Sequence, residues 1–217
     1  MAVIAVIQQK GGVGKSTITA NLAGELIHLR KKVVLLDLDP QQSLTQWARM
    51  GDGLLKQFVR PVDFDEKNHR TFRTEVERAR SAADYVILDC PPGFPDAAML
   101  AALVADLALL PVTPSPLDVL AARQALEMMR EAQKQRGGKK PVVGFIPSKV
   151  VQTTTLGRDL PGNLKNFGEV VLPGISQRVI VAEAVLEGAT VREIFQESES
   201  VEEFQKLARA VEKMVAQ

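Results

Sequence analysis

Short runs of apolar residues alternate along the chain with longer segments in which apolar residues recur every three or four positions. The short runs have the length and the branched side chains of buried β-strands, and they are Val3–Ile7, Val33–Leu36, Tyr85–Leu88, Leu107–Pro111 and Val142–Ile146. The helical segments are Lys15–Arg30, Gln41–Met50, Thr71–Ser81, Pro95–Val104 and Leu117–Gln135. Because the strands are apolar along their whole length, the pattern predicts an α/β fold, with a mostly parallel, twisted β-sheet flanked by helices on both faces.

The last third of the chain is less regular. Its pattern predicts a helix over Thr153–Phe167 with a break at Pro161-Gly162, a late strand at Val170–Leu172 and a final helix over Val201–Ala216. Ser200 and Glu203 have the spacing of a capping box at the start of that helix. Its apolar stripe predicts packing on the sheet. The alternative is a membrane-surface helix, but the polar face mixes acidic and basic residues, whereas an anionic membrane attracts a basic excess.

Composition is typical of one globular domain, which we expect to span residues 1–217. Hydrophobic residues make up 46% of the chain and charged residues 24%, which argues against disorder. The formal net charge of +1 indicates no particular partner. Cys90 is the only cysteine and cannot form an internal disulfide, so we expect a reducing compartment. The N-terminus lacks the features of a signal peptide, and we therefore expect a cytoplasmic protein without a membrane partner.

The segment Lys-Gly-Gly-Val-Gly-Lys-Ser-Thr follows the first predicted strand and opens the first predicted helix. Its glycines allow successive backbone N–H groups to turn toward an anion at a helix N-terminus. Lys15 can then reach the β- and γ-phosphates of ATP, and the Ser16 hydroxyl can ligate Mg²⁺. The predicted nucleotide-binding residues are Lys10, Gly11, Gly12, Val13, Gly14, Lys15, Ser16 and Thr17. The alternative is an ordinary glycine-rich turn.

Two further motifs place carboxylates at the ends of predicted strands, where open α/β sheets bind ligands. Asp37 and Asp39 lie in the sequence Asp-Leu-Asp-Pro-Gln, and their alternative role is to cap a helix or turn. Asp89 ends the strand that starts at Tyr85 and matches a Walker B aspartate, which holds Mg²⁺, commonly through water. Cys90 follows it, and we expect a small buried residue there rather than a nucleophile or redox group.

In this order, over residues 4–93, the three motifs resemble those of the ParA/MinD family of P-loop ATPases. Gln9 stands where an ordinary phosphate loop has glycine, and Lys10 adds the entrance lysine of the family's deviant loop. The resemblance implies a P-loop NTPase fold and an ATP-sandwich dimer in which Lys10 contacts the partner's nucleotide. It also implies that Lys10, Lys15 and Asp39 are catalytic, with Asp39 orienting the attacking water. Asp37 would support either the magnesium shell, with Ser16 and Asp89, or the loop.

The resemblance is strongest for small plasmid-partition and cargo-positioning members. The tract Asp39–Trp47 of this chain is similar to the corresponding tract of those proteins. The phosphate loop begins at residue 10, so we expect no helix-turn-helix domain before it. One cysteine is too few for the iron-cluster branch, and one tyrosine is too few for the tyrosine-kinase branch. The chain also lacks the basic amphipathic tail of a MinD protein. Where the family often has an asparagine near adenine, this chain has Ser148, so base recognition stays open.

Members of this type are slow ATPases that bind DNA non-specifically as ATP dimers, on the nucleoid, and are released when a ParB-like or cargo adaptor protein stimulates hydrolysis. Residues 137–192 contain seven basic and four acidic residues, a net charge of +3, and residues 193–217 carry −3. The predicted DNA contacts are Lys149, Arg158, Lys165 and Arg178. The alternative is an ordinary solvated surface. The charged stretch Asp63–Arg80 is either a loop and surface helix or a docking face for the adaptor.

A metabolic P-loop enzyme, such as an ATP-dependent ligase or small-molecule kinase, is the alternative function. It would use Lys15, Ser16 and Asp89 for ATP but would also need an acceptor pocket. Lys10 has no obvious role in trans in a simple kinase, and turnover without DNA or adaptor separates the two functions.

Overall fold

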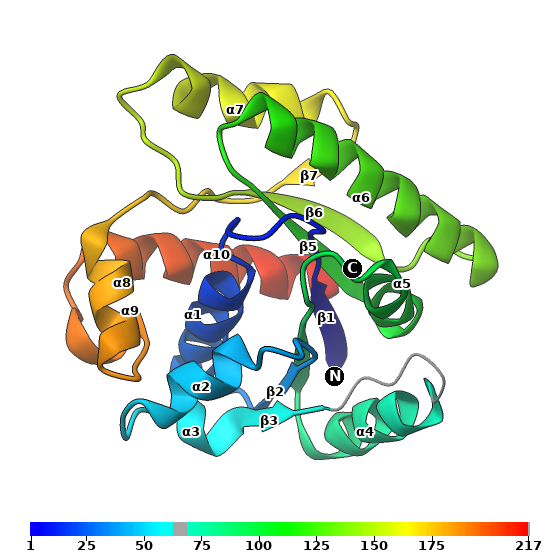
Figure 1. Ribbon diagram of the computed structural model, residues 1–217, viewed down its shortest axis with the longest axis horizontal. Coiled ribbons are helices and arrows are strands. Elements are labelled where there is room, and N and C mark those ends of the chain that lie inside the picture. The colour runs from blue at the N-terminus through cyan, green and yellow to red at the C-terminus, as the bar shows by residue number, and fades with distance from the viewer. Residues whose placement is uncertain (63–68, 217) are drawn as a thin grey trace.

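A central β-sheet lies between two layers of helices in the computed structural model, which describes residues 1–62 and 69–216 (Figure 1). The strands of the described chain are β1 (Ala2–Val6), β2 (Val33–Asp37), β3 (Val59–Pro61), β4 (Tyr85–Asp89), β5 (Leu107–Val112), β6 (Val142–Pro147) and β7 (Val170–Val171). They pair in parallel in the order β3-β2-β4-β1-β5-β6-β7. The predicted fold class is therefore confirmed.

The helices divide between the two faces of the sheet. They are α1 (Lys15–His28), α2 (Ser43–Arg49), α3 (Leu55–Phe58), α4 (His69–Ala82), α5 (Pro95–Val104), α6 (Pro116–Gln135), α7 (Thr155–Lys165), α8 (Val179–Leu186), α9 (Val191–Ile194) and α10 (Glu199–Val215). One buried cluster packs α4, α5, α6 and α7 against the sheet, and the other packs α1, α2 and α8 to α10. Alternate residues of β1 belong to opposite clusters, which explains why this strand is apolar throughout.

Strand register brings the three motifs to one edge of the sheet. Asp89 at the end of β4 pairs with Val6 of β1 on one side and with Asp37 of β2 on the other. The phosphate loop follows β1 directly, so the loop and both carboxylates lie at the carboxyl ends of adjacent parallel strands. This is the position at which open α/β sheets bind ligands.

The predicted cap of the final helix is wrong. Helix α10 begins at Glu199, and the Ser198 hydroxyl accepts a hydrogen bond from Val201 N at 3.4 Å. Ser200 is buried inside the first turn, and Glu203 instead accepts hydrogen bonds from Ser176. The apolar stripe of α10 packs into the core beside α1, which confirms the packing alternative over the membrane-surface one. No helix of the described residues has both the length and the apolar character to cross a membrane.

Other elements differ from the pattern more modestly. The predicted break at Pro161 does not occur. Helix α7 continues through this residue, and the missing N–H of proline removes one backbone hydrogen bond of the helix. Strand β3 and helices α3, α8 and α9 were not predicted. Helix α4 is the described part of the charged stretch, and residues 63–68 lie outside the described residues.

Candidate nucleotide-binding site

The phosphate loop turns from β1 into α1 through residues with left-handed backbone angles. Gly12 has φ +77° and Gly14 has φ +94°, which side chains other than glycine rarely adopt. A Cβ atom on Gly14 would lie 2.9 Å from the Ser148 hydroxyl. That hydroxyl donates a 2.7 Å hydrogen bond to the carbonyl oxygen of Val13. Ser148 therefore supports the loop from the end of β6, a role that the sequence did not indicate.

Lys15 lies across this loop and is nearly buried, with 7% of its surface exposed. Its Nζ donates to the carbonyl oxygen of Lys10 at 3.1 Å, so the amine is already held over the loop where phosphates would bind. Burial lowers the pKa of Lys15, and the carboxylates of Asp89 and Asp39 oppose this effect. The two acidic groups that were predicted to act with Lys15 are thus near enough to interact with it electrostatically.

Asp89 is almost completely buried behind the loop. One carboxylate oxygen accepts from the Thr19 hydroxyl at 3.2 Å, while Oδ2 has no hydrogen-bond partner among the described residues. Burial raises the pKa of Asp89 to about 7, although the Ser16 and Thr19 hydroxyls and Lys15 favour the charged form. A buried, unpartnered carboxylate oxygen with the Ser16 hydroxyl beside it suits a hard divalent cation.

The described residues contain no cluster of three or more histidine, cysteine or acidic residues that could hold a metal ion alone. Mg²⁺ is usually bound by one or two protein groups together with water and nucleotide phosphates. Ser16 and Asp89 are the residues that would hold it. Cys90, the next residue, is buried as expected, and burial raises the pKa of its thiol.

Asp37 is fully buried, and its carboxylate accepts hydrogen bonds from the loop that follows it and from helix α2. One oxygen accepts from both the backbone N–H and the hydroxyl of Thr45, at 2.8 and 2.7 Å, and the other accepts from Asp39 N at 3.1 Å. These bonds favour the loop-support role over the magnesium role. Asp39 is half-buried, and its carboxylate accepts from Gln41 N at 2.9 Å.

The Lys10 side chain turns away from this pocket. It forms an ion pair with Asp118 near the start of α6, and Asp118 also accepts from the Thr113 hydroxyl. The side chain of Lys10 is 43% exposed, whereas that of Asp118 is 9% exposed. Asp118 is therefore a member of the site that the motifs alone did not assign. Within one protomer, Lys10 is committed to this carboxylate.

A cleft of about 270 Å³ opens beside the loop. Apolar side chains from α1, α8 and the β7–α8 connection form much of its wall, and Lys149, Gln177 and Arg178 contribute polar groups; the apolar residues are Ile18, Ile175, Val181, Ala182 and Val185. Its position next to Gly14 and Thr17 suits the base and ribose of a nucleotide whose phosphates occupy the loop.

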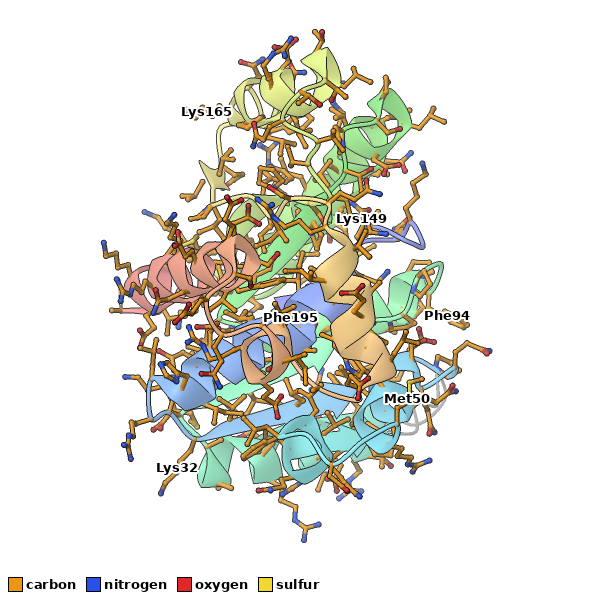
Figure 2. All side chains as sticks on the ribbon, turned by 90° about the vertical axis from the view of Figure 1, so that its left-hand side faces the viewer. Lys32, Met50, Phe94, Lys149, Lys165 and Phe195 are labelled. Atoms are coloured by element: carbon orange, nitrogen blue, oxygen red, sulfur yellow. The ribbon has the colours of Figure 1, made fainter. Side chains whose placement is uncertain are left out.

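The predicted DNA contacts fall in two places. Lys149 and Arg178 line the cleft, whereas Arg158 and Lys165 are exposed on α7, and Figure 2 shows Lys149 and Lys165 well separated. Arg178 is also ion-paired with Glu199 and Glu203 of α10. Lys149 and Lys165 therefore do not lie side by side within a single protomer.

Comparison with known proteins gives consistent matches. The family described as "CobQ/CobB/MinD/ParA nucleotide binding domain" matches residues 4–191. The chain is 31% identical over 191 residues to maintenance of carboxysome distribution protein A of Halothiobacillus neapolitanus, covering 87% of this chain and 85% of the relative. It is 29% identical to the chromosome-partitioning ATPase Soj of Thermus thermophilus, covering 96% and 94%. The Mg-ADP complex of Pyrococcus horikoshii septum site-determining protein MinD superposes with a TM-score of 0.78 at 21% identity, covering 98% and 96%.

Proposed function

Because the chain belongs to the CobQ/CobB/MinD/ParA family of nucleotide-binding domains, we propose that it is an ATP-dependent partition or positioning ATPase. Its ATP-bound form is a homodimer that binds DNA non-specifically on the nucleoid. An adaptor protein on the cargo stimulates hydrolysis and releases the dimer. The relatives named for carboxysome distribution and chromosome partitioning support this function and do not favour a metabolic ligase or kinase.

The observation that carries the proposal is that the two lysines of the phosphate loop point in different directions. Lys15 is nearly buried, its Nζ donates to the carbonyl oxygen of Lys10, and it interacts electrostatically with Asp89 and Asp39. Lys10 faces outward onto α6 and is held by Asp118 rather than by the pocket of its own protomer. An outward lysine at the loop entrance is suited to a second protomer's phosphates, since it can stabilise negative charge that develops there.

Each side chain then has a distinct task in hydrolysis. The backbone N–H groups of residues 11–17 bind the phosphates, and Lys15 neutralises charge on them. Ser16 and Asp89 would hold Mg²⁺, which would supply electrostatic stabilisation of the phosphates when bound. Asp39 accepts a hydrogen bond from the attacking water and orients it, while Asp37 fixes the loop that carries Asp39. Lys10 leaves Asp118 and contacts the partner's nucleotide.

Two substitutions test this account. Lys15→Ala should abolish binding of a fluorescent ATP analogue, because the phosphates lose their buried cation. Asp39→Ala should keep ATP binding and accumulate the dimer, measured by light scattering during size exclusion. Rapid hydrolysis by the Asp39 variant would contradict its assignment.

Turnover separates the proposal from the metabolic alternative. A metabolic enzyme typically turns over at roughly 1–1000 per second, whereas a switch without its adaptor should be much slower. Fast turnover that requires a small-molecule acceptor, with no ATP-dependent dimer, would favour the ligase or kinase.

A further inference from the structure

The loop that carries Asp39 leads directly into α2, and a side chain at each end holds this helix. At its start, the backbone N–H and hydroxyl of Thr45 both donate to Asp37. Near its end lies Trp47, the only tryptophan of the chain, which is 4% exposed. Its indole Nε1 donates to the carbonyl oxygen of Ala189 at 3.2 Å. The position of the Asp39 loop therefore depends on contacts made by both Thr45 and Trp47.

The acceptor lies in the junction between α8 and α9, residues 187–190, next to the C-terminal end of α2. Figure 2 shows α8 as the orange helix that runs from near Lys149 toward Met50, the residue after α2. The two segments touch through backbone atoms, because a Cβ on Gly51 would lie only 2.1 Å from the carbonyl oxygen of Glu187. The same α8 lines the cleft beside the phosphate loop.

This junction is firmly attached to α1, the helix that the phosphate loop opens. The Asn21 side chain accepts from Val191 N at 2.8 Å. Glu25 and Arg192 form a two-point ion pair, with both N–O distances 2.7 Å and Glu25 almost fully buried. The hydrogen bond of Trp47 thus connects α2, which follows the Asp39 loop, to the α8–α9 junction, and the contacts with Asn21 and Glu25 hold that junction against α1.

We propose that Trp47 is a positioning residue for ATP hydrolysis, acting through its indole N–H on the Asp39 loop. The inference rests on the proposed function, which assigns Asp39 to the attacking water. A purely structural role would need only the bulk of the ring in the core cluster around α1 and α2. A positioning role also needs the N–H, because its hydrogen bond to Ala189 holds α2 and the Asp39 loop in place. A small displacement of a catalytic group strongly lowers the rate.

Trp47→Phe separates these roles, since it keeps an aromatic ring and removes the donor. We expect kcat to fall about fivefold, the factor typical of losing one buried hydrogen bond, while KM and the Kd for ATP change less than twofold. Thr45→Val, which removes the hydroxyl at the other end of the path, should lower kcat similarly. The double variant should lose less than the product of the two single effects, because both act on one loop. Arg49→Ala, an exposed change on the same helix, is the control and should leave kcat unchanged.

Hydrogen exchange supplies a readout that does not require hydrolysis. In Trp47→Phe, amides of residues 39–45 should exchange faster, whereas those of residues 14–26 should keep their protection. Unchanged kcat with unchanged exchange in 39–45 would overturn the inference, and so would a loss of ATP affinity equal to the loss in kcat. If the unmodified protein hydrolyses no ATP, the proposed function fails, and the exchange measurement still decides whether Trp47 holds the loop.

Discussion

Replacing Asp89 by asparagine is expected to stabilise the nucleotide-free protein above pH 7 and to weaken the Mg²⁺ binding proposed at this residue. The carboxylate is 1% exposed and one oxygen has no hydrogen-bond partner among the described residues. Burial raises its pKa from the ordinary 3.8 to about 7. That difference corresponds to roughly 4 kcal/mol of stability, taken as an upper limit.

The direction follows from which state binds the proton more tightly. The folded chain holds the Asp89 proton up to about pH 7, whereas the unfolded chain releases it near pH 4. The contribution of Asp89 to folding is therefore fully present below pH 4 and is lost as the pH rises to 7. Between pH 5 and 7 the wild type should lose about 1.4 kcal/mol per pH unit relative to Asp89→Asn.

Urea unfolding from pH 5 to 8, without nucleotide or Mg²⁺, measures this difference. The two stability curves should diverge with rising pH and run parallel above 7. Curves that stay parallel over the whole range would refute the reasoning, because they would mean that Asp89 is not strained by burial.

Asp106 is the matched control, because its pKa is lowered rather than raised and its replacement should change stability in the opposite direction. It accepts hydrogen bonds from Lys140 and from Val3 N. Burial tends to raise the pKa of Asp106, but these bonds and the charges of Lys140 and Arg80 outweigh burial and lower it. Its contribution is present above the unfolded pKa and is lost as the pH falls through the folded one. Asp106→Asn should therefore destabilise the protein at pH 7 and have less effect in acid.

Two further predictions concern ion pairs. Asp118→Asn should release Lys10 and tighten ATP-dependent dimerisation by up to about fivefold, since a partly exposed ion pair contributes at most about 1 kcal/mol. Analytical ultracentrifugation measures the dimerisation constant. Weaker dimerisation of the variant would show that Asp118 is needed in the dimer. Glu25→Gln should lower the free energy of unfolding by about 3 kcal/mol, because Arg192 would keep a charge without its partner. The double replacement Glu25→Leu with Arg192→Met should recover most of that loss in urea unfolding, and equal losses would argue against an ion-pair origin.

The phosphate loop and its acidic partners could be predicted because each is a local signal in the sequence. A strand, a glycine-rich turn and a helix are consecutive at Lys10–Thr17, and Asp89 directly ends an apolar run. The five main strands were found for the same reason, since residues buried on both faces leave an uninterrupted apolar run. Strand β3 was missed because its residues are half-buried or exposed.

The missing parts of the site depend on contacts between distant segments. Asp118 pairs with Lys10, 108 residues away, because β5 lies next to β1 in the sheet, an order that apolar runs do not encode. An acidic residue in the first turn of a helix is common, so Asp118 shared in the weaker family resemblance without indicating a role. Ser148 and Trp47 likewise act through backbone carbonyls of remote segments. The cap of α10 was misassigned because Ser200, with Glu203 three residues later, matches the capping-box spacing, whereas the residue three after Ser198 is Val201.

DNA retention by Asp39→Ala tests the central claim most directly, because this variant should hold ATP without consuming it. With ATP and Mg²⁺ it should form a dimer that retains duplex DNA of unrelated sequences, and retention should fall steeply as salt rises. With ADP it should remain monomeric and release the DNA, and adding Lys10→Ala should abolish the ATP-dependent dimer. Failure to retain DNA at low salt with ATP, or equal retention with ATP and ADP, would contradict the account.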